Sequence, residues 1–171
     1  MYQDFKDLLS AFHAHRVKYL IIGGYAVALH AQPRATQDQD LFIKADPANA
    51  QAIYAALATF GAPVENIRAE DLADPSSFIR FEREPVAVDI HPDIPGVEFD
   101  AAWENRVEAI IDPQSRLKAF FNSRDDLIAS ELASGRTRDL ADVEEIREAA
   151  DSQQAEAHER PPEPTQRGPS Q

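Results

Sequence analysis

The sequence predicts an α/β (α+β) fold, in which a small mixed sheet is flanked by helices and followed by a C-terminal helical part. A short apolar run, VKYLII, ends at a glycine pair and leads into a segment with helical character. Two later segments, residues 77–82 and 85–91, alternate apolar and polar side chains around Arg83-Glu84, which is typical of a hairpin. Towards the C-terminus apolar residues recur at helical spacing, which indicates that helices end the folded part.

The N-terminal half is expected to alternate helices and strands. Phe5, Leu8 and Phe12 recur at helical spacing and indicate an amphipathic first helix. Asp46 suits an N-cap and Pro47 suits the first helical position, so a further helix is expected to begin there. In chain order, the expected elements are a helix over residues 2–15, a strand over 17–22, a short helix over 24–31, a strand over 39–44 and a helix over 46–58.

The C-terminal half divides at Pro113. A strand is expected over residues 106–111, and the pattern is helical from Pro113 to about residue 150. We therefore expect a core over residues 1–112, a helical part over residues 113–150 that packs on the core, and a tail over residues 151–171. The tail holds four of the twelve prolines and almost nothing apolar larger than alanine, so it cannot bury enough surface to offset the entropy of ordering. We expect it to be disordered.

The composition is that of a soluble globular protein and excludes several kinds of site. Hydrophobic residues make up 43% of the chain and charged residues 27%, and no apolar run is long enough to span a membrane. Cysteine is absent, which excludes a disulfide, a thiolate zinc site and a cysteine nucleophile, and which fits a cytoplasmic protein. The net charge of −13 argues against broad, nonspecific binding of nucleic acid, although it permits a local basic cleft.

A pair of carboxylates follows the glycines and is the main chemical signal of the sequence. Asp38 and Asp40 lie two residues apart at the start of an expected strand, so both side chains point to the same face. Two carboxylates this close disfavour joint ionisation unless a cation lies between them. A hard divalent metal such as Mg²⁺ takes carboxylate oxygens and commonly bridges to phosphate, so the pair predicts a metal site. The helix that follows the glycines offers N–H groups that suit phosphate.

A third carboxylate lies on the expected strand of residues 85–91. The sequence VAVDI alternates, so its valines and isoleucine face one way, and Asp89 and His91 face the other. An aspartate in an otherwise apolar strand is costly to bury unless it is paired or bound to a metal. Asp89 therefore either joins the metal site or flanks the Pro92-Asp93 turn, and His91 is expected to be a hydrogen-bonding neighbour.

These blocks resemble the minimal nucleotidyltransferases of the polymerase-beta superfamily, and the pattern is similar to that of the AbiEii-like, toxin-type members. The similar segments are Gly23-Gly24, Arg34-Ala35-Thr36, Asp38-Gln39-Asp40-Leu41 and the block GRTRDLADV at residues 135–143. The resemblance spans roughly residues 17–146. It implies the nucleotidyltransferase fold, with an NTP as substrate. It also implies that Asp38, Asp40 and Asp89 are catalytic and hold two Mg²⁺ (or Mn²⁺) ions.

The resemblance further implies which residues bind the nucleotide. They are Gly23, Gly24, Tyr25, Arg34, Thr36, Arg136 and Asp139. Alternatives stay open, because glycines serve any strand-to-helix turn that needs positive φ, and Tyr25 can simply pack. Arg34 can instead form an ion pair with a nearby aspartate, and Asp139 can simply belong to an acidic first helical turn. The family commonly has a cation a few residues before the last glycine, where this chain has Glu131.

The function predicted is metal-dependent transfer of an NMP from an NTP to a hydroxyl acceptor, with release of pyrophosphate. Resemblance to the toxin-type members implies a tRNA 3′ end or a protein side chain as acceptor, often with a cognate antitoxin. A second interpretation keeps the chemistry but makes a small-molecule antibiotic the acceptor, as in lincosamide and aminoglycoside nucleotidyltransferases. A third is a non-catalytic, nucleotide-binding or antitoxin-like relative, which Glu131 favours and the three aspartates oppose.

Overall fold

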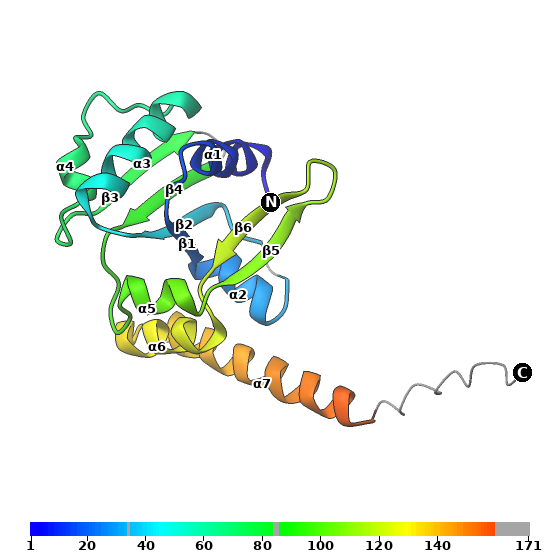
Figure 1. The fold of residues 1–171 in the computed structure, drawn as a ribbon. Helices are drawn as coiled ribbons and strands as arrows, with labels where there is room; N and C mark the ends of the chain where they lie inside the picture. The colour runs from blue at the N-terminus through cyan, green and yellow to red at the C-terminus, as the bar shows by residue number, and fades with distance from the viewer. Residues whose placement is uncertain (34, 84–85, 160–171) are drawn as a thin grey trace, which may run out of the picture.

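The computed structural model describes residues 1–33, 35–83 and 86–159, and across this part of the chain six strands form one mixed sheet (Figure 1). The strand order is β3-β4-β2-β1-β6-β5. β2 runs parallel to β4, and β1 runs parallel to β6, whereas the other neighbouring pairs are antiparallel. The strands are β1 Tyr19–Ile22, β2 Asp38–Ile43, β3 Ile79–Arg83, β4 Val86–His91, β5 Val107–Asp112 and β6 Leu117–Phe121. The predicted α/β class with a mixed sheet is confirmed.

Helices flank this sheet on both faces (Figure 1). α1 and α3 pack against each other on one face over the larger apolar core. α5 covers the other face through a smaller apolar cluster that includes Leu20, Phe42 and Phe99, while α6 and α7 pack on each other and on α2. The helices are α1 Gln3–Ala14, α2 Gly23–His30, α3 Pro47–Phe60, α4 Ala69–Leu72, α5 Phe99–Glu104, α6 Arg124–Ser134 and α7 Thr137–Glu159. No helix within the described residues is both long enough and apolar enough to cross a membrane.

The predicted start of α3 is confirmed. The Asp46 side chain accepts a hydrogen bond from the backbone N–H of Asn49 at 2.7 Å, and Pro47 occupies the first helical position. Asn49 is itself buried, and its side chain bonds the backbone of Lys18 and of Lys44. The start of α3 is therefore tied to the ends of β1 and β2, which carry the glycine turn and the aspartates at their opposite ends.

The prediction of helix from Pro113 onward is wrong. β6 forms a hairpin with β5 and pairs in parallel with β1 through Ile21 and Phe121, so the sheet extends beyond residue 112. The segment LKAFF is short, and its apolar residues fit a strand as well as a helix turn. Burial follows the strand period, because Ala119 and Phe121 are buried while Lys118 is exposed. The helical part therefore begins with α6, whose N-cap is Ser123.

The C-terminal helix is longer than predicted. α7 continues to Glu159, whereas the sequence predicted that a disordered tail begins at residue 151. Residues 151–159, DSQQAEAHE, contain neither glycine nor proline and include several good helix formers, so a helix already anchored by packing can continue through them. The prolines that led to the prediction begin at residue 161, and residues 160–171 lie outside the described part.

Candidate active site

The register of the sheet places four chemically active side chains in neighbouring strands. Asp40 on β2 pairs with Asp89 on the parallel strand β4, and Asp89 pairs in turn with Arg80 on β3. Val88 and Ile90 point into the larger core, so Asp89 and His91 lie on the opposite face, together with Asp40. Paired residues of adjacent strands share a face, and this register therefore brings the carboxylates together.

A metal-compatible cluster is formed by Asp40, Asp89 and His91. Each of these residues offers one ligand atom, and these atoms all lie within 4.8 Å of one another. His91 Nε2 lies 3.3 Å from Asp40 Oδ1. Burial raises the pKa of Asp89, the negative charges of Asp40 and Asp38 raise it further, and the cation of Arg80 opposes this rise. A bound cation would favour the ionised form of Asp89.

Asp38 and His91 are the remaining residues that the sequence singled out on these two strands. Asp38 lies at the start of β2 with about half of its side chain exposed, and Arg80 Nη2 is 3.6 Å from its Oδ1. The contact between His91 and Asp40 agrees with the expected hydrogen-bonding neighbour, and the same geometry makes the His91 ring nitrogen a candidate third ligand atom. The sequence already indicated that His91 lies on the same face as Asp89, because the two residues are two positions apart on one strand.

The two glycines allow the start of α2 to approach the aspartates closely. Gly23 has φ of +59°, and a Cβ atom built on it would overlap the Asp40 carboxylate, with Cγ at 3.0 Å. A Cβ on Gly24 would lie 3.1 Å from the Thr36 side chain. Any larger residue would therefore push the helix start away from Asp40. The close approach places the first N–H groups of α2 beside the carboxylates, where a metal-bound phosphate could meet both.

A cavity of about 280 Å³ joins the glycine turn, the aspartates and the start of α7. Most of the residues that the sequence singled out line it, and Glu131, Arg138 and Asp142 join them. The lining is Gly23, Gly24, Thr36, Asp38, Asp40, Asp89, Glu131, Arg136, Arg138, Asp139 and Asp142. Of the remaining predicted residues, Tyr25 lines a separate cavity with Met1 and Tyr2 and packs edge-on against Phe5. Arg34 lies outside the described residues.

The helical side of this cavity combines an acidic cluster with two arginines, Arg136 and Arg138. Glu131, Asp139 and Asp142 are all buried. Burial, together with the charges of Asp139 and Asp142 and a hydrogen bond to Asp139, raises the pKa of Glu131 to about 7. Although burial alone acts to raise it, the pKa of Asp139 is lowered by hydrogen bonds from Arg136 and Glu131. In this pair a proton therefore favours Glu131 over Asp139.

Arg136 is the cation at the mouth of the cavity. Its Nε donates to Asp139 Oδ2 at 2.8 Å, and its side chain remains largely exposed. Gly135 adopts φ of +67° and ends α6, which turns the chain so that Arg136 precedes α7. The negative charge of Asp40 contributes to raising the pKa of Arg136, so the guanidinium is close enough to interact with the metal-compatible cluster. An anionic group at the mouth could therefore contact Arg136 and the start of α2 together.

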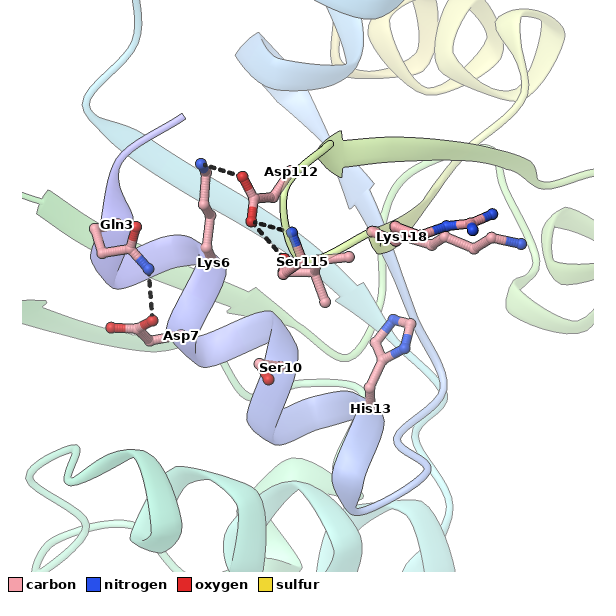
Figure 2. A pocket seen from close by; sticks show the side chains of 10 residues that line it. Gln3, Lys6, Asp7, Ser10, His13, Asp112, Ser115 and Lys118 are labelled. Atoms are coloured by element: carbon pink, nitrogen blue, oxygen red, sulfur yellow. Dashed lines mark hydrogen bonds and ion pairs between the residues drawn. The ribbon is translucent and has the colours of Figure 1, made fainter.

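A larger cavity of about 410 Å³ lies elsewhere, between α1 and the β5–β6 hairpin (Figure 2). Lys6 and Asp112 pair within its lining, whereas Lys118 pairs with Glu108 outside it. Lys6 Nζ lies 3.1 Å from Asp112 Oδ1, and the other oxygen of Asp112 accepts from the backbone N–H of Ser115. Gln3 donates to Asp7 at 2.8 Å. None of the residues predicted from the sequence lines this cavity, and we assign no chemistry to it.

Comparison with known proteins points to one family. The sequence model of a family described as "nucleotidyltransferase of unknown function (DUF6036)" matches residues 2–149. Among curated proteins none matches the chain. A lincosamide antibiotic adenylyltransferase, LnuA, solved with lincomycin bound, superposes with a TM-score of 0.54 at 18% identity, over 87% of this chain and 98% of that chain. An antigenic nucleotidyltransferase-like protein from Paracoccidioides brasiliensis superposes with a TM-score of 0.55 at 18% identity, over 86% of this chain and 73% of that chain.

Proposed function

Because the chain belongs to this nucleotidyltransferase family, we propose that it transfers an NMP from an NTP to a hydroxyl acceptor and releases pyrophosphate, with a divalent metal as cofactor. One observation supports this proposal above the others. Asp40 and Asp89, two members of the metal-compatible cluster, line the same cavity as the Gly23 turn, so candidate metal ligands and the start of α2 meet at one place. Phosphoryl chemistry needs this combination of positioning and charge neutralisation.

The donor atoms fit a divalent cation. Asp40 and Asp89 offer carboxylate oxygens, which suit Mg²⁺ and Mn²⁺, and the imidazole of His91 is a better ligand for Mn²⁺ than for Mg²⁺. Asp38 precedes Asp40 on the same strand face and can add a further carboxylate oxygen at the exposed edge of the site. A divalent cation bound there would neutralise the triphosphate and lower the pKa of the acceptor hydroxyl.

The residues of the chain itself would orient the nucleotide. The glycines let the start of α2 lie against Asp40 and Thr36, so the first N–H groups of the helix can bind a phosphate held beside Asp40. Arg136 and Arg138 lie at the opposite side of the same cavity and can contact the triphosphate from there. Asp89 lies one strand further from the glycines than Asp40, so the acceptor hydroxyl is expected to approach from the β3–β4 side.

The acceptor is either a macromolecule or a small molecule. The toxin-type resemblance suggests a tRNA 3′ end or a protein side chain, in a system that includes an antitoxin. The charge of the molecule favours a small acceptor, because −13 is unfavourable for binding a polyanion. The fold similarity to LnuA, which acts on a lincosamide antibiotic, is consistent with this second candidate.

A transfer assay tests the proposal. Each α-labelled NTP is supplied with Mn²⁺ or Mg²⁺ against total tRNA, a protein lysate and an antibiotic panel, and label transfer and pyrophosphate release are measured. Transfer that is lost in Asp40→Asn and Asp89→Asn but retained in Asp125→Asn would support the enzyme and identify its acceptor. Asp125 is an exposed matched control in the first turn of α6. Metal-dependent NTP binding without turnover would favour the non-catalytic alternative.

A further inference from the structure

Arg80 is placed to interact with two of the three predicted metal carboxylates. Its Nη1 lies 3.1 Å from Oδ1 and 2.9 Å from Oδ2 of Asp89, and its Nη2 lies 3.6 Å from Oδ1 of Asp38. The contact follows from the register, because Arg80 on β3 pairs with Asp89 on β4, which pairs in turn with Asp40 on β2. The guanidinium therefore bridges the carboxylates that a metal would use.

A guanidinium in this position competes with a metal ion. Both oxygens of Asp89 accept hydrogen bonds from Arg80, and the Asp89 side chain is about one-tenth exposed, so little of the carboxylate remains accessible. Charge-assisted hydrogen bonds of this kind are among the stronger polar interactions in proteins. Arg80 contacts Asp38 as well as Asp89. A metal that uses Asp89 and Asp38 together must displace this side chain.

The side chain of Arg80 can leave without losing every partner. About two-fifths of it is exposed, and it lies at the edge strand of the sheet. Glu82, which follows it on the same strand face, has its Oε1 3.5 Å from Arg80 Nε. The guanidinium can therefore turn towards Glu82 and solvent while the carboxylates turn to the metal.

We propose that Arg80 is the resident cation of the metal site, and that metal loading exchanges its guanidinium for a divalent ion. This inference rests on the proposed function, because it assumes that Asp89 is a metal ligand. Before loading, Arg80 offsets the repulsion between Asp38, Asp40 and Asp89 and keeps the carboxylates close together. After loading, its charge is free at the β3 edge, on the side from which the acceptor is expected.

The proposal predicts that removal of the Arg80 guanidinium strengthens metal binding. Arg80→Gln should bind Mn²⁺ more tightly than the wild-type protein, because the ion no longer displaces a charge-assisted pair. The loss of such a pair corresponds to an increase in affinity of about tenfold. Without metal, the variant should unfold at a lower temperature than the wild-type protein, because the carboxylates then lack a cation. Saturating Mn²⁺ should remove this difference.

Titration of Mn²⁺ by calorimetry, combined with thermal unfolding at increasing Mn²⁺, tests these expectations. Arg68→Gln is the matched control, since Arg68 is also an exposed arginine paired with an aspartate, Asp71, and it does not line the cavity. Arg68→Gln also removes one positive charge from the protein. The gain in Mn²⁺ affinity of this variant therefore measures the effect of net charge alone. Arg80→Lys keeps the charge but lacks the planar guanidinium whose Nη1 contacts Asp89 while Nη2 lies near Asp38, and its Mn²⁺ affinity should lie between those of the wild-type protein and Arg80→Gln.

The outcomes separate this inference from the proposed function. A gain for Arg80→Gln well above that of Arg68→Gln would support the exchange. An unchanged or weaker affinity, in a wild-type protein that does bind Mn²⁺ through Asp89, would overturn the role of Arg80 and leave the metal site intact. If neither the wild-type protein nor any Arg80 variant bound Mn²⁺, the metal site itself would be wrong, and the exchange with it. Should Arg80→Gln fail to fold, Arg80→Lys provides the same comparison.

Discussion

Replacing Glu131 by glutamine is expected to stabilise the protein more at pH 8 than at pH 5. Glu131 is 9% exposed and faces Asp139 and Asp142, and its pKa is raised from 4.5 to about 7, chiefly by burial. The folded protein therefore keeps a proton on Glu131 at pH values where the unfolded chain has lost it. The free energy of unfolding consequently falls as the pH rises from about 4.5 to about 7, and it stays low above that range. Glutamine has nearly the same shape and no such titration.

The size of the effect follows from the shift in pKa. A change from 4.5 to about 7, at about 1.4 kcal/mol per pH unit, corresponds to a loss of at most about 3 kcal/mol when Glu131 is fully ionised. At pH 5 the unfolded chain has mostly ionised, so about 1 kcal/mol of this loss is already present. The difference in unfolding free energy between Glu131→Gln and the wild-type protein should therefore grow by about 2 kcal/mol between pH 5 and pH 8. For a domain of this size, that is about 4–8 °C in Tm.

Urea unfolding of both proteins at pH 5 and at pH 8, in the absence of divalent metal, measures this difference. Glu144→Gln on the exposed face of α7 is the control, because it removes the same charge from the same helical part. The gap between Glu131→Gln and the wild-type protein should widen with pH, whereas the gap for Glu144→Gln should stay nearly constant. A Glu131→Gln gap that is flat with pH, or that narrows, would show that Glu131 is already ionised at pH 5.

Three further predictions concern the turn, the cap and the tail. Gly23→Ala should destabilise the protein by about 1–3 kcal/mol in thermal unfolding and weaken Mn²⁺ binding, because Gly23 has φ of +59° and the new Cβ would overlap Asp40. An unchanged Tm would refute the close approach of Gly23 to Asp40. Asp46→Ala should cost about 1 kcal/mol through loss of the helix cap and leave Mn²⁺ affinity unchanged, and reduced affinity would show that the cap positions the site. Deletion of residues 151–171 should change the free energy of unfolding by less than about 0.5 kcal/mol, because residues 151–156 are exposed; a large loss would mean that the end of α7 docks on the core.

The elements of the fold with strong local signals were predictable from the sequence. The Asp46-Pro47 start of α3 is a chemical signal that needs no tertiary information. β6 was missed because LKAFF is too short to distinguish a period of two from a period of 3.6, and its pairing with β1 decides the outcome. The extension of α7 was missed because the prolines after residue 160 dominated the composition of the segment.

Only some residues of the candidate site could be predicted from the sequence. The alternation along a strand shows which face a side chain lies on, but it does not show which residues of other strands lie beside it. Parity placed Asp38 and Asp40 on one face of their strand, the resemblance added Asp89, and the structure has Asp40 and Asp89 paired across β2 and β4. The role of Arg80 could not be predicted, since it depends on the register between β3 and β4. Tyr25 packs on Phe5, which was one of the two alternatives left open for it, since the sequence does not report the direction of a side chain in the first turn of a short helix.

The charges of the residues that line the cavity determine which ligands can bind there without a metal ion. Among the described residues that line it, six side chains carry a carboxyl group and two carry a guanidinium. Even when Glu131 keeps its proton, the lining remains negative and opposes a free triphosphate. NTP binding should therefore be undetectable by calorimetry in EDTA and should appear when Mn²⁺ is added, with Asp125→Asn behaving like the wild-type protein. Equal NTP affinity with and without metal would mean that Arg136 and the start of α2 suffice, and that the carboxylates serve another purpose.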